Sequence, residues 1–202
     1  MSSITHALKE WAIALLALEQ GKTIMLLRKG GIKESQGKFI VPRDSAERSA
    51  GGDRILLYPT YEHQQPSLLK PVYQNSVTPV TSGWHPKQVT ISSWAEITDV
   101  LPVSEENTIK ALLPFHIWNE EFITTRLKWK PRQPVYILLL RTYKLPSPQV
   151  IEYRTEYGGC TSWIDLGLSI DCNSTYPVLP DDSYKQLTTE IRQIIGNNLA
   201  LA

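Results

Sequence analysis

The sequence has little cysteine, almost no net charge and no long apolar run, and each of these absences narrows the class of protein. Only two of the 202 residues are cysteines, Cys160 and Cys172, which excludes a disulfide framework and argues against a cysteine zinc site. The formal net charge is +1, so only a local basic patch could hold nucleic acid. No apolar run approaches the ~18–20 residues that span a bilayer, and no signal-peptide pattern is present. We therefore expect a cytoplasmic protein without a membrane partner.

The residues that are present indicate a folded, globular chain. Hydrophobic residues make up 42% and charged residues 20% of the sequence, a balance that supports a substantial core. We expect one domain over residues 1–202, with an exposed insert near residues 43–52 and a loop-rich segment near residues 74–86.

Apolar periodicity predicts an α+β fold. Helices are expected over residues 6–20, 65–73, 105–113 and 116–129, and from Asp182 or Ser183 to Gly196. Strands are expected over residues 22–29, 38–42, 53–61, 134–145 and 161–166. Ser93 is expected to cap a short helix after the alternating Val89 and Ile91. Because no regular βαβ period occurs, we predict a mixed or mainly antiparallel sheet packed by an N-terminal, a central and a C-terminal helix.

The first stretch with chemical potential is Arg28-Lys29-Gly30-Gly31, at the end of an apolar run. Two glycines let backbone N–H groups turn toward one point, and the two cations suit a phosphate or carboxylate. The spacing matches neither a Walker A loop nor a dinucleotide-binding fingerprint. These four residues are therefore candidate phosphate ligands, and the alternative is a glycine turn with solvated cations.

The second stretch is Tyr61-Glu62-His63-Gln64, which follows another apolar strand. Glu62 and His63 are candidate catalytic residues, because a histidine beside a carboxylate can act as a general base or a ligand. If both strand ends meet at one edge of the sheet, Glu34 and Glu62 could hold magnesium or manganese near the cations. The predicted function is binding of a nucleic acid or nucleotide, with metal-dependent hydrolysis as its catalytic form; whether the protein is an enzyme stays open. The alternative for Glu62 and His63 is a pair of solvated loop residues.

A third stretch, residues 126–132, supports a different reading. Arg126, Lys128, Lys130 and Arg132 interleave with Trp129, so the cations could follow a phosphate backbone while the ring stacks on a base. This surface defines a non-catalytic RNA- or partner-binding module. Cations that complement the dipole at a helix C-terminus would produce the same pattern.

A purely structural reading remains for the charged residues near the N-terminus. Lys9, Glu10, Arg28 and Glu34 could form an ion-pair network between the first helix and the first strand, without any ligand.

Four motifs in order carry a family resemblance: residues 7–11 (ALKEW), 26–32 (LLRKGGI), 58–64 (YPTYEHQ) and the pair RLKWKP and PVYILLLRTYKL from residue 126 onward. Together they resemble an uncharacterised bacterial family, well represented in cyanobacteria and known as a domain of unknown function. The resemblance implies a bacterial cytosolic protein and lends no activity. A shorter likeness, of residues 21–28 and 51–58 to small RNA-binding barrels of the pseudouridine-synthase-associated type, favours the RNA-binding alternative.

Overall fold

The computed structural model describes residues 3–29, 48–49, 52–159 and 161–199. In these residues the chain forms one sheet with the strand order β2-β6-β5-β4-β1-β7, in which β3 pairs with β4 and β8 pairs with β6. The strands are β1 (Ser3–Trp11), β2 (Met25–Arg28), β3 (Arg48–Ser49), β4 (Gly52–Thr60), β5 (Gln88–Val103), β6 (Val135–Glu152), β7 (Trp163–Asp171) and β8 (Tyr176–Pro177). The helices are α1 (Ala12–Glu19), α2 (Pro71–Gln74), α3 (Glu106–Ala111), α4 (Glu120–Lys128) and α5 (Asp181–Leu199), with 3₁₀ turns at Pro66–Leu68, Leu113–Phe115 and Thr155–Tyr157.

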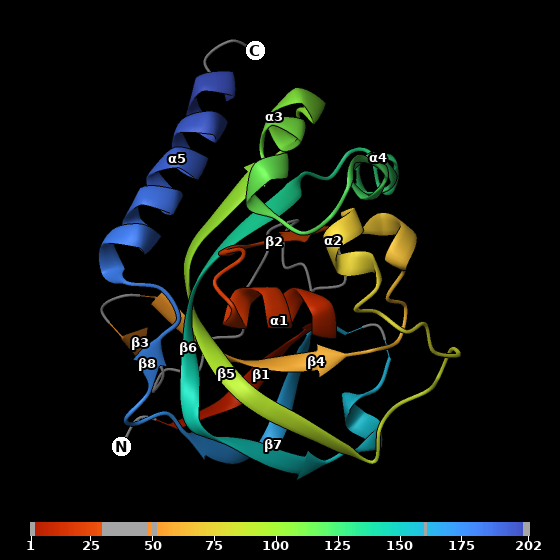
Figure 1. Ribbon diagram of the computed structural model, residues 1–202, viewed down its shortest axis with the longest axis vertical. Coiled ribbons are helices and arrows are strands. Elements are labelled where there is room, and N and C mark those ends of the chain that lie inside the picture. The colour runs from red at the N-terminus through yellow and green to blue at the C-terminus, as the bar shows by residue number, and fades with distance from the viewer. Residues whose placement is uncertain (1–2, 30–47, 50–51, 160, 200–202) are drawn as a thin grey trace.

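Among the strands that the structure describes, one pair is parallel. β1 and β4 run in the same direction, whereas the other pairings between described strands are antiparallel. β5 and β6 are long and curved, and they extend along most of the molecule (Figure 1). Their register shifts between Ile91 and Ser93 and again between Ile97 and Asp99, irregularities of the kind that bend a strand. The mixed, mainly antiparallel sheet of the predicted α+β class is confirmed.

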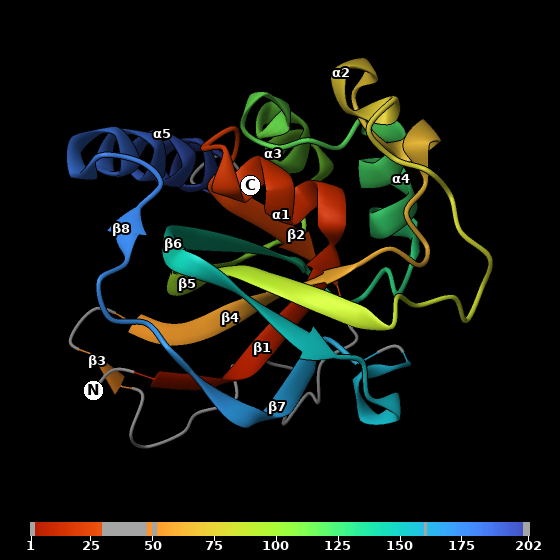
Figure 2. The same cartoon turned by 60° about the horizontal axis from the view of Figure 1, so that its bottom comes forward.

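The two faces of the sheet bury separate apolar clusters. Helices α1, α3, α4 and α5 cover one face (Figure 2), and the larger core lies beneath them, around residues such as Leu18, Ile109, Trp118 and Leu139. The smaller core fills the other, curved side and includes Leu56, where Trp94 and Tyr143 stack with ring centroids 4.2 Å apart. In the part of the chain that the structure describes, no helix is long and apolar enough to cross a bilayer.

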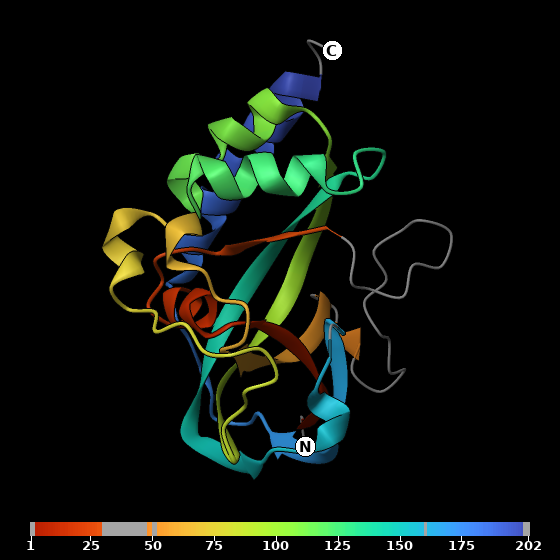
Figure 3. The same cartoon turned by 90° about the vertical axis from the view of Figure 1, so that its right-hand side faces the viewer.

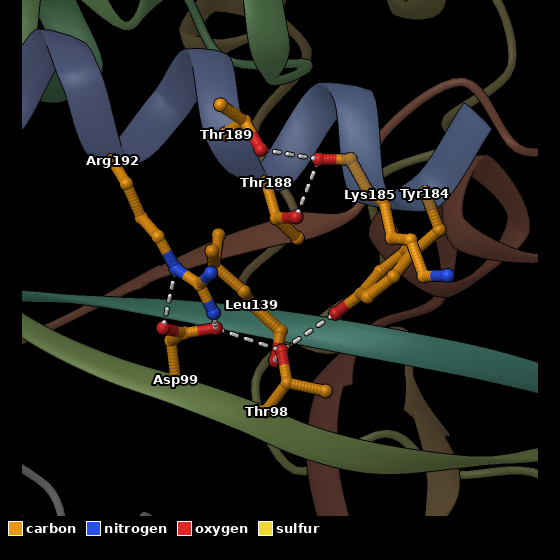
Figure 4. A network of polar contacts seen from close by, with 8 residues as sticks. All are labelled: Thr98, Asp99, Leu139, Tyr184, Lys185, Thr188, Thr189 and Arg192. Atoms are coloured by element: carbon orange, nitrogen blue, oxygen red, sulfur yellow. Dashed lines mark hydrogen bonds and ion pairs between the residues drawn. The ribbon is translucent and has the colours of Figure 1, made fainter. Parts of the chain in front are cut away.

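The C-terminal helix is fixed to the sheet by polar contacts as well as by apolar packing. Arg192 of α5 donates from Nε and Nη2 to the two carboxylate oxygens of Asp99 on β5, each at 2.9 Å (Figure 4). About two helical turns before Arg192, the hydroxyl of Tyr184 lies 2.7 Å from Thr98 Oγ1. Burial raises the pKa of Tyr184 to about 12, so this hydroxyl stays protonated at neutral pH.

The predicted helix over residues 6–20 is wrong in its first half. Residues 3–11 form β1, and the helix begins only at Ala12. β1 lies between β4 and β7 and is buried on both faces, because Ala7 belongs to the smaller core and Leu8 to the larger one. A strand buried on both faces loses the polar–apolar alternation that distinguishes it from a helix.

The short helix predicted after Ser93 is also wrong, because β5 continues unbroken from Gln88 to Val103. Ser92 and Ser93 donate hydrogen bonds to Glu19 Oε1 at 2.5 and 2.6 Å, so their hydroxyls anchor the end of α1 to the sheet instead of capping a helix.

Other boundaries differ less from prediction. α4 begins at Glu120, after the N-cap Asn119, whose side chain accepts from Phe122 N at 3.1 Å, and α5 continues past Gly196. Residues 75–87 contain no helix or strand. The strand predicted at residues 38–42, and the insert near 43–52 apart from its short strand residues, lie outside the described residues.

Candidate functional site

The candidate site lies where β1 and β4 end side by side. In this parallel pair Trp11 is opposite Thr60, and the Thr60 hydroxyl donates to the Glu10 carbonyl at 3.0 Å. The turn after β4 is held by the buried Gln64, whose Oε1 accepts from Ile13 N at 3.1 Å and whose Nε2 donates to Tyr61 O at 3.3 Å. Gln64 thus satisfies a backbone N–H in the first turn of α1 and fixes the position of the residues just before it.

Glu62 and His63 lie in this turn. His63 has a φ of 64°, in the left-handed region that non-glycine residues seldom adopt, and its Nε2 is 3.4 Å from Glu62 Oε1. The same oxygen accepts from Gly83 N at 2.5 Å and from Ser82 Oγ at 3.2 Å. The backbone hydrogen bond from Gly83 is the main cause of the lowered pKa of Glu62, which is ionised at neutral pH. Glu62 therefore holds the loop that carries Trp84.

Arg28 is held by an ion pair inside the fold. Its Nη1 donates to Glu10 Oε2 at 2.6 Å and to Lys9 O at 3.4 Å, and its Nη2 donates to Ser162 Oγ. The two side chains are mostly buried, at 15% exposure for Arg28 and 8% for Glu10. The Glu10–Arg28 part of the expected ion-pair network is present, now between two strands, while Glu34 lies outside the described residues.

Lys9 does not belong to that ion pair. Its Nζ donates to the carbonyls of Tyr157, Gly158 and Gly159 at 2.6, 3.3 and 2.8 Å. Lys9 therefore holds the segment that precedes β7 against the end of β1, and its charge is partly balanced by carbonyl dipoles.

Lys29 connects the end of β2 to the end of α4, two ends that lie one above the other on the right of Figure 3. Its buried Nζ donates at 3.0 Å to the carbonyl of Leu127, in the last turn of α4, where the helix dipole favours a cation. Burial lowers the pKa of Lys29. Through this contact the first predicted stretch lies next to the third.

One polar cleft, of about 570 Å³, brings the three predicted stretches together. Its lining includes Arg28 and Lys29 from the first, Glu62 and His63 from the second, and Arg126, Trp129 and Lys130 from the third. Five basic side chains and two carboxylates line it, counting Lys9 and Glu10, which gives a local excess of positive charge in a protein of net charge +1. Lys128 and Arg132 are exposed but do not line the cleft.

The third stretch presents both cation and ring to the cleft. Lys130 Nζ lies 4.9 Å from the centroid of the Trp129 ring, and Trp129 is 44% exposed. Arg126 lies 4.9 Å from the Phe122 ring. Burial lowers the pKa of Arg126, and the carboxylate of Glu10 opposes this shift.

An aromatic cavity of about 450 Å³ adjoins the polar cleft. Both hollows are lined by Lys9, Thr60, Glu62, His63 and Gly159, so these five residues lie at the boundary between them. The aromatic lining comes from three segments distant in sequence: Tyr58 and Tyr61, then Trp84 and His85, then Tyr153 and Tyr157.

The rings of the aromatic cavity are ordered by contacts with one another. Tyr61 and Trp84 meet edge to face, with centroids 5.9 Å apart at 87°, and His85 stacks on Tyr153 at 3.5 Å. Trp84 is 44% exposed, so a large aromatic surface remains open to solvent. The buried hydroxyl of Tyr58 has no hydrogen-bond partner among the described residues, and burial raises the pKa of Tyr58.

Some predicted site residues are not tested by this geometry. Gly30, Gly31 and Glu34 lie outside the described residues. Among the residues that are described, no three His, Cys, Asp or Glu side chains come together in a group that could hold a metal ion. Of the two predicted ligands for magnesium or manganese, Glu34 and Glu62, only Glu62 lies in the described residues, and no second ligand is found beside it there.

Sequence reasoning missed the aromatic cavity. Trp84 and His85 lie in a polar loop that has no periodicity, and Tyr153 and Tyr157 follow a strand that was expected to end at Leu145 but continues to Glu152. The only signal in the sequence is the pair Trp84-His85 in a polar loop, and nothing local indicates that the aromatic residues converge.

Comparisons with known proteins place the chain in a family and not in a functional class. A family model described as a domain of unknown function, DUF1802, matches residues 7–190, and the chain belongs to this family. The expectation of an uncharacterised family is therefore confirmed. No curated protein matches the sequence.

Two solved structures have a similar arrangement of the chain. One is the crystal structure of ASCH from Zymomonas mobilis, with 14% identity and a TM-score of 0.44 over 91% of this chain and 93% of that chain. The other is a tyrosine-to-phenylalanine mutant of the same protein, with 13% identity and a TM-score of 0.44 over 91% of this chain and 96% of that chain.

Proposed function

We propose that this protein is a binding module for single-stranded nucleic acid, which it holds along the polar cleft and the adjoining aromatic cavity. The observation that carries the proposal is that the two hollows adjoin and share five lining residues, one hollow being rich in basic side chains and the other in aromatic rings. Proteins that bind single strands combine these two features, because cations follow the phosphates while exposed rings stack on bases.

The charge of the cleft supports a phosphate-bearing ligand. The net charge of the whole protein is close to neutral, whereas five basic side chains and only two carboxylates line the cleft. A cleft lined mainly by one sign of charge focuses the field and attracts ions of the opposite sign. Lys130 is the cation best suited to reach a ligand, because it is exposed, whereas Arg28 and Lys29 are engaged by Glu10 and Leu127.

The exposed rings support a strand of at least two nucleotides rather than an isolated phosphate. Trp129 lies at the polar cleft and Trp84 at the aromatic cavity, and each is 44% exposed. Stacking on each ring contributes about 1–3 kcal/mol per base in single-strand binding.

The first experiment measures binding of a labelled eight-nucleotide RNA and its DNA equivalent by fluorescence anisotropy, over a range of sodium chloride concentrations. We expect affinity to fall as salt rises. Lys130→Ala should weaken binding and reduce the slope of log affinity against log salt concentration by about one unit, the contribution of one phosphate contact. Trp129→Ala should reduce the free energy of binding by about 1–3 kcal/mol. Lys128→Ala is the matched control: Lys128 is exposed two residues earlier but does not line the cleft, so its removal should change little.

Two results would overturn the proposal. The first is absence of binding at low salt, or binding that does not respond to salt. The second is cleavage of the oligonucleotide in the presence of magnesium or manganese by the native protein but not by Glu62→Gln, which would replace the binding module with a metal-dependent hydrolase.

A further inference from the structure

We propose that the aromatic cavity receives one unstacked base of the bound strand, and that Glu62 selects bases that carry an exocyclic amino group. This inference rests on the proposed function and assigns the bound base and its contacts. Adenine and cytosine have such a group, whereas uracil presents only carbonyl oxygens and a ring N–H in its place.

The cavity has the dimensions and the lining that a base requires. Its volume of about 450 Å³ falls within the ~300–1,000 Å³ that is usual for small-molecule sites. Single-stranded nucleic acid is commonly recognised by splaying a base out of its stack onto an aromatic side chain. The Trp84 ring is the exposed platform, and its edge-to-face contact with Tyr61 fixes its orientation at the mouth of the cavity.

The same lining argues against a cationic occupant. An aromatic cage can hold a quaternary ammonium group through cation–π contacts. Here the ammonium group of Lys9 is part of the wall and would repel a second cation. A neutral aromatic ring attached to a phosphate chain satisfies both the rings of the cavity and the basic cleft beside it.

Glu62 is placed to contact the base because it lines both hollows. Its hydrogen bonds from Gly83 and Ser82 both go to Oε1. A carboxylate accepts up to about four hydrogen bonds over its two oxygens, so Glu62 retains capacity to accept from an amino group. The contacts from the loop also keep this carboxylate in a fixed orientation, which is what discrimination between bases needs.

The competition experiment uses unlabelled eight-nucleotide oligo(A), oligo(C) and oligo(U) against the labelled strand. We expect oligo(A) and oligo(C) to compete about tenfold better than oligo(U), the lower part of the range for a good contact between a side chain and a base edge. In Glu62→Gln the amide oxygen can still accept from Gly83, so the loop keeps its anchor while the negative charge is lost. The difference between oligo(C) and oligo(U) should then shrink to within about twofold.

Trp84 supplies a direct optical readout. A base stacked on its ring should quench part of the tryptophan fluorescence, and Trp84→Phe should lose that part of the quenching while it still binds the strand. Trp84→Ala should weaken all three oligonucleotides by a similar factor, about fivefold or more. Tyr176→Ala is the control: Tyr176 is 55% exposed on β8 and lines neither hollow, so its loss should leave binding unchanged.

The outcomes separate this inference from the proposed function. If the native protein binds no oligonucleotide, the proposed function fails. If it binds with salt dependence but Glu62→Gln keeps the native order of preference, or Trp84→Phe keeps the native quenching, the strand lies in the polar cleft alone and the base pocket is refuted. Thermal unfolding of each variant checks that it is folded.

Discussion

The ion pair between Arg28 and Glu10 offers a quantitative test of whether Arg28 is mainly structural. Replacing Arg28 by Met keeps the aliphatic stem but leaves the Glu10 carboxylate, 8% exposed, without its main partner. Removing one partner of a buried pair costs about 3–5 kcal/mol. Arg126 is close enough for its pKa to respond to the Glu10 charge, so it compensates in part, and we expect the lower end, about 3 kcal/mol.

The assay is urea unfolding at neutral pH of four proteins: the native chain, Arg28→Met, Glu10→Gln and the double variant. The double variant removes both charges, so we expect it to lose no more than about 1 kcal/mol, with a coupling of at least about 2 kcal/mol between the sites, because Arg28→Met alone costs about 3 kcal/mol. Lys110→Met is the exposed control. It breaks the 2.7 Å pair with Glu106 on α3, and because both groups are exposed to solvent it should change the free energy of unfolding little.

A small effect would refute this reasoning. If Arg28→Met costs no more than Lys110→Met, the pair does not stabilise the fold, and the guanidinium is available to a ligand. The double variant also informs the proposed function, because it removes one positive and one negative charge from the cleft. Its salt dependence of oligonucleotide binding should therefore match that of the native protein if Arg28 does not contact phosphate.

Two further predictions concern the fold. Burial lowers the pKa of His116 to about 3, so the neutral imidazole stabilises the fold fully above its unfolded pKa of 6.5, and this stability is lost as the pH falls from 6.5 toward 3. By pH 5 the free energy of unfolding should fall by about 2 kcal/mol. Urea unfolding at pH 7.5 and pH 5 should show this loss for the native chain but not for His116→Gln. If both proteins lose the same free energy of unfolding, the prediction is wrong. Arg192→Ala removes the bidentate contact with Asp99, and because Arg192 is about half exposed we expect a loss of at most about 1 kcal/mol, with faster hydrogen exchange in α5 only. Uniformly faster exchange across the sheet would show that α5 and the sheet unfold together.

The sequence predicts the strands that end in charge better than it predicts the strands that are buried on both faces. The apolar runs at Met25–Arg28 and from Val135 onward are strands as expected, and each is closed by polar residues. β1 was mistaken for a helix because its apolar residues face two cores at once and no glycine or proline separates it from α1. Local periodicity cannot resolve this case, since the two faces become distinct only when β4 and β7 are paired to β1.

The same limit applies to turn signals. Ser93 predicts the start of a short helix because serine is common at N-caps. In the structure the hydroxyls of Ser92 and Ser93 both pair with Glu19, which lies more than seventy residues earlier in the chain. A polar residue inside a strand is acceptable when a distant side chain satisfies it, and a single sequence does not say where that partner lies.

For the candidate site, the sequence indicates the three polar stretches but does not indicate that all three line one cleft. Of the three stretches, the first two are expected to form one site if their strand ends meet, and the third is expected to form a rival site. They line one cleft because β1 and β4 are parallel, β2 pairs with β6, and Lys29 reaches the end of α4. Each of these is a contact between segments far apart in sequence, and the parallel pair in particular needs a long connection that local pattern does not specify.

One local signal does point to the site, and it lies in β1. Lys9 and Glu10 are adjacent charged residues in a strand that is paired on both sides, at 9% and 7% exposure. Neighbouring residues of a strand point to opposite faces, so each needs its own partner, and burial of an unpaired charge is too costly to persist. Lys9 binds the carbonyls of residues 157–159, whereas Glu10 binds Arg28. The two charges thereby fix the wall shared by both hollows and the end of β2. A charged pair inside a buried strand is therefore the feature from which the position of the cleft follows.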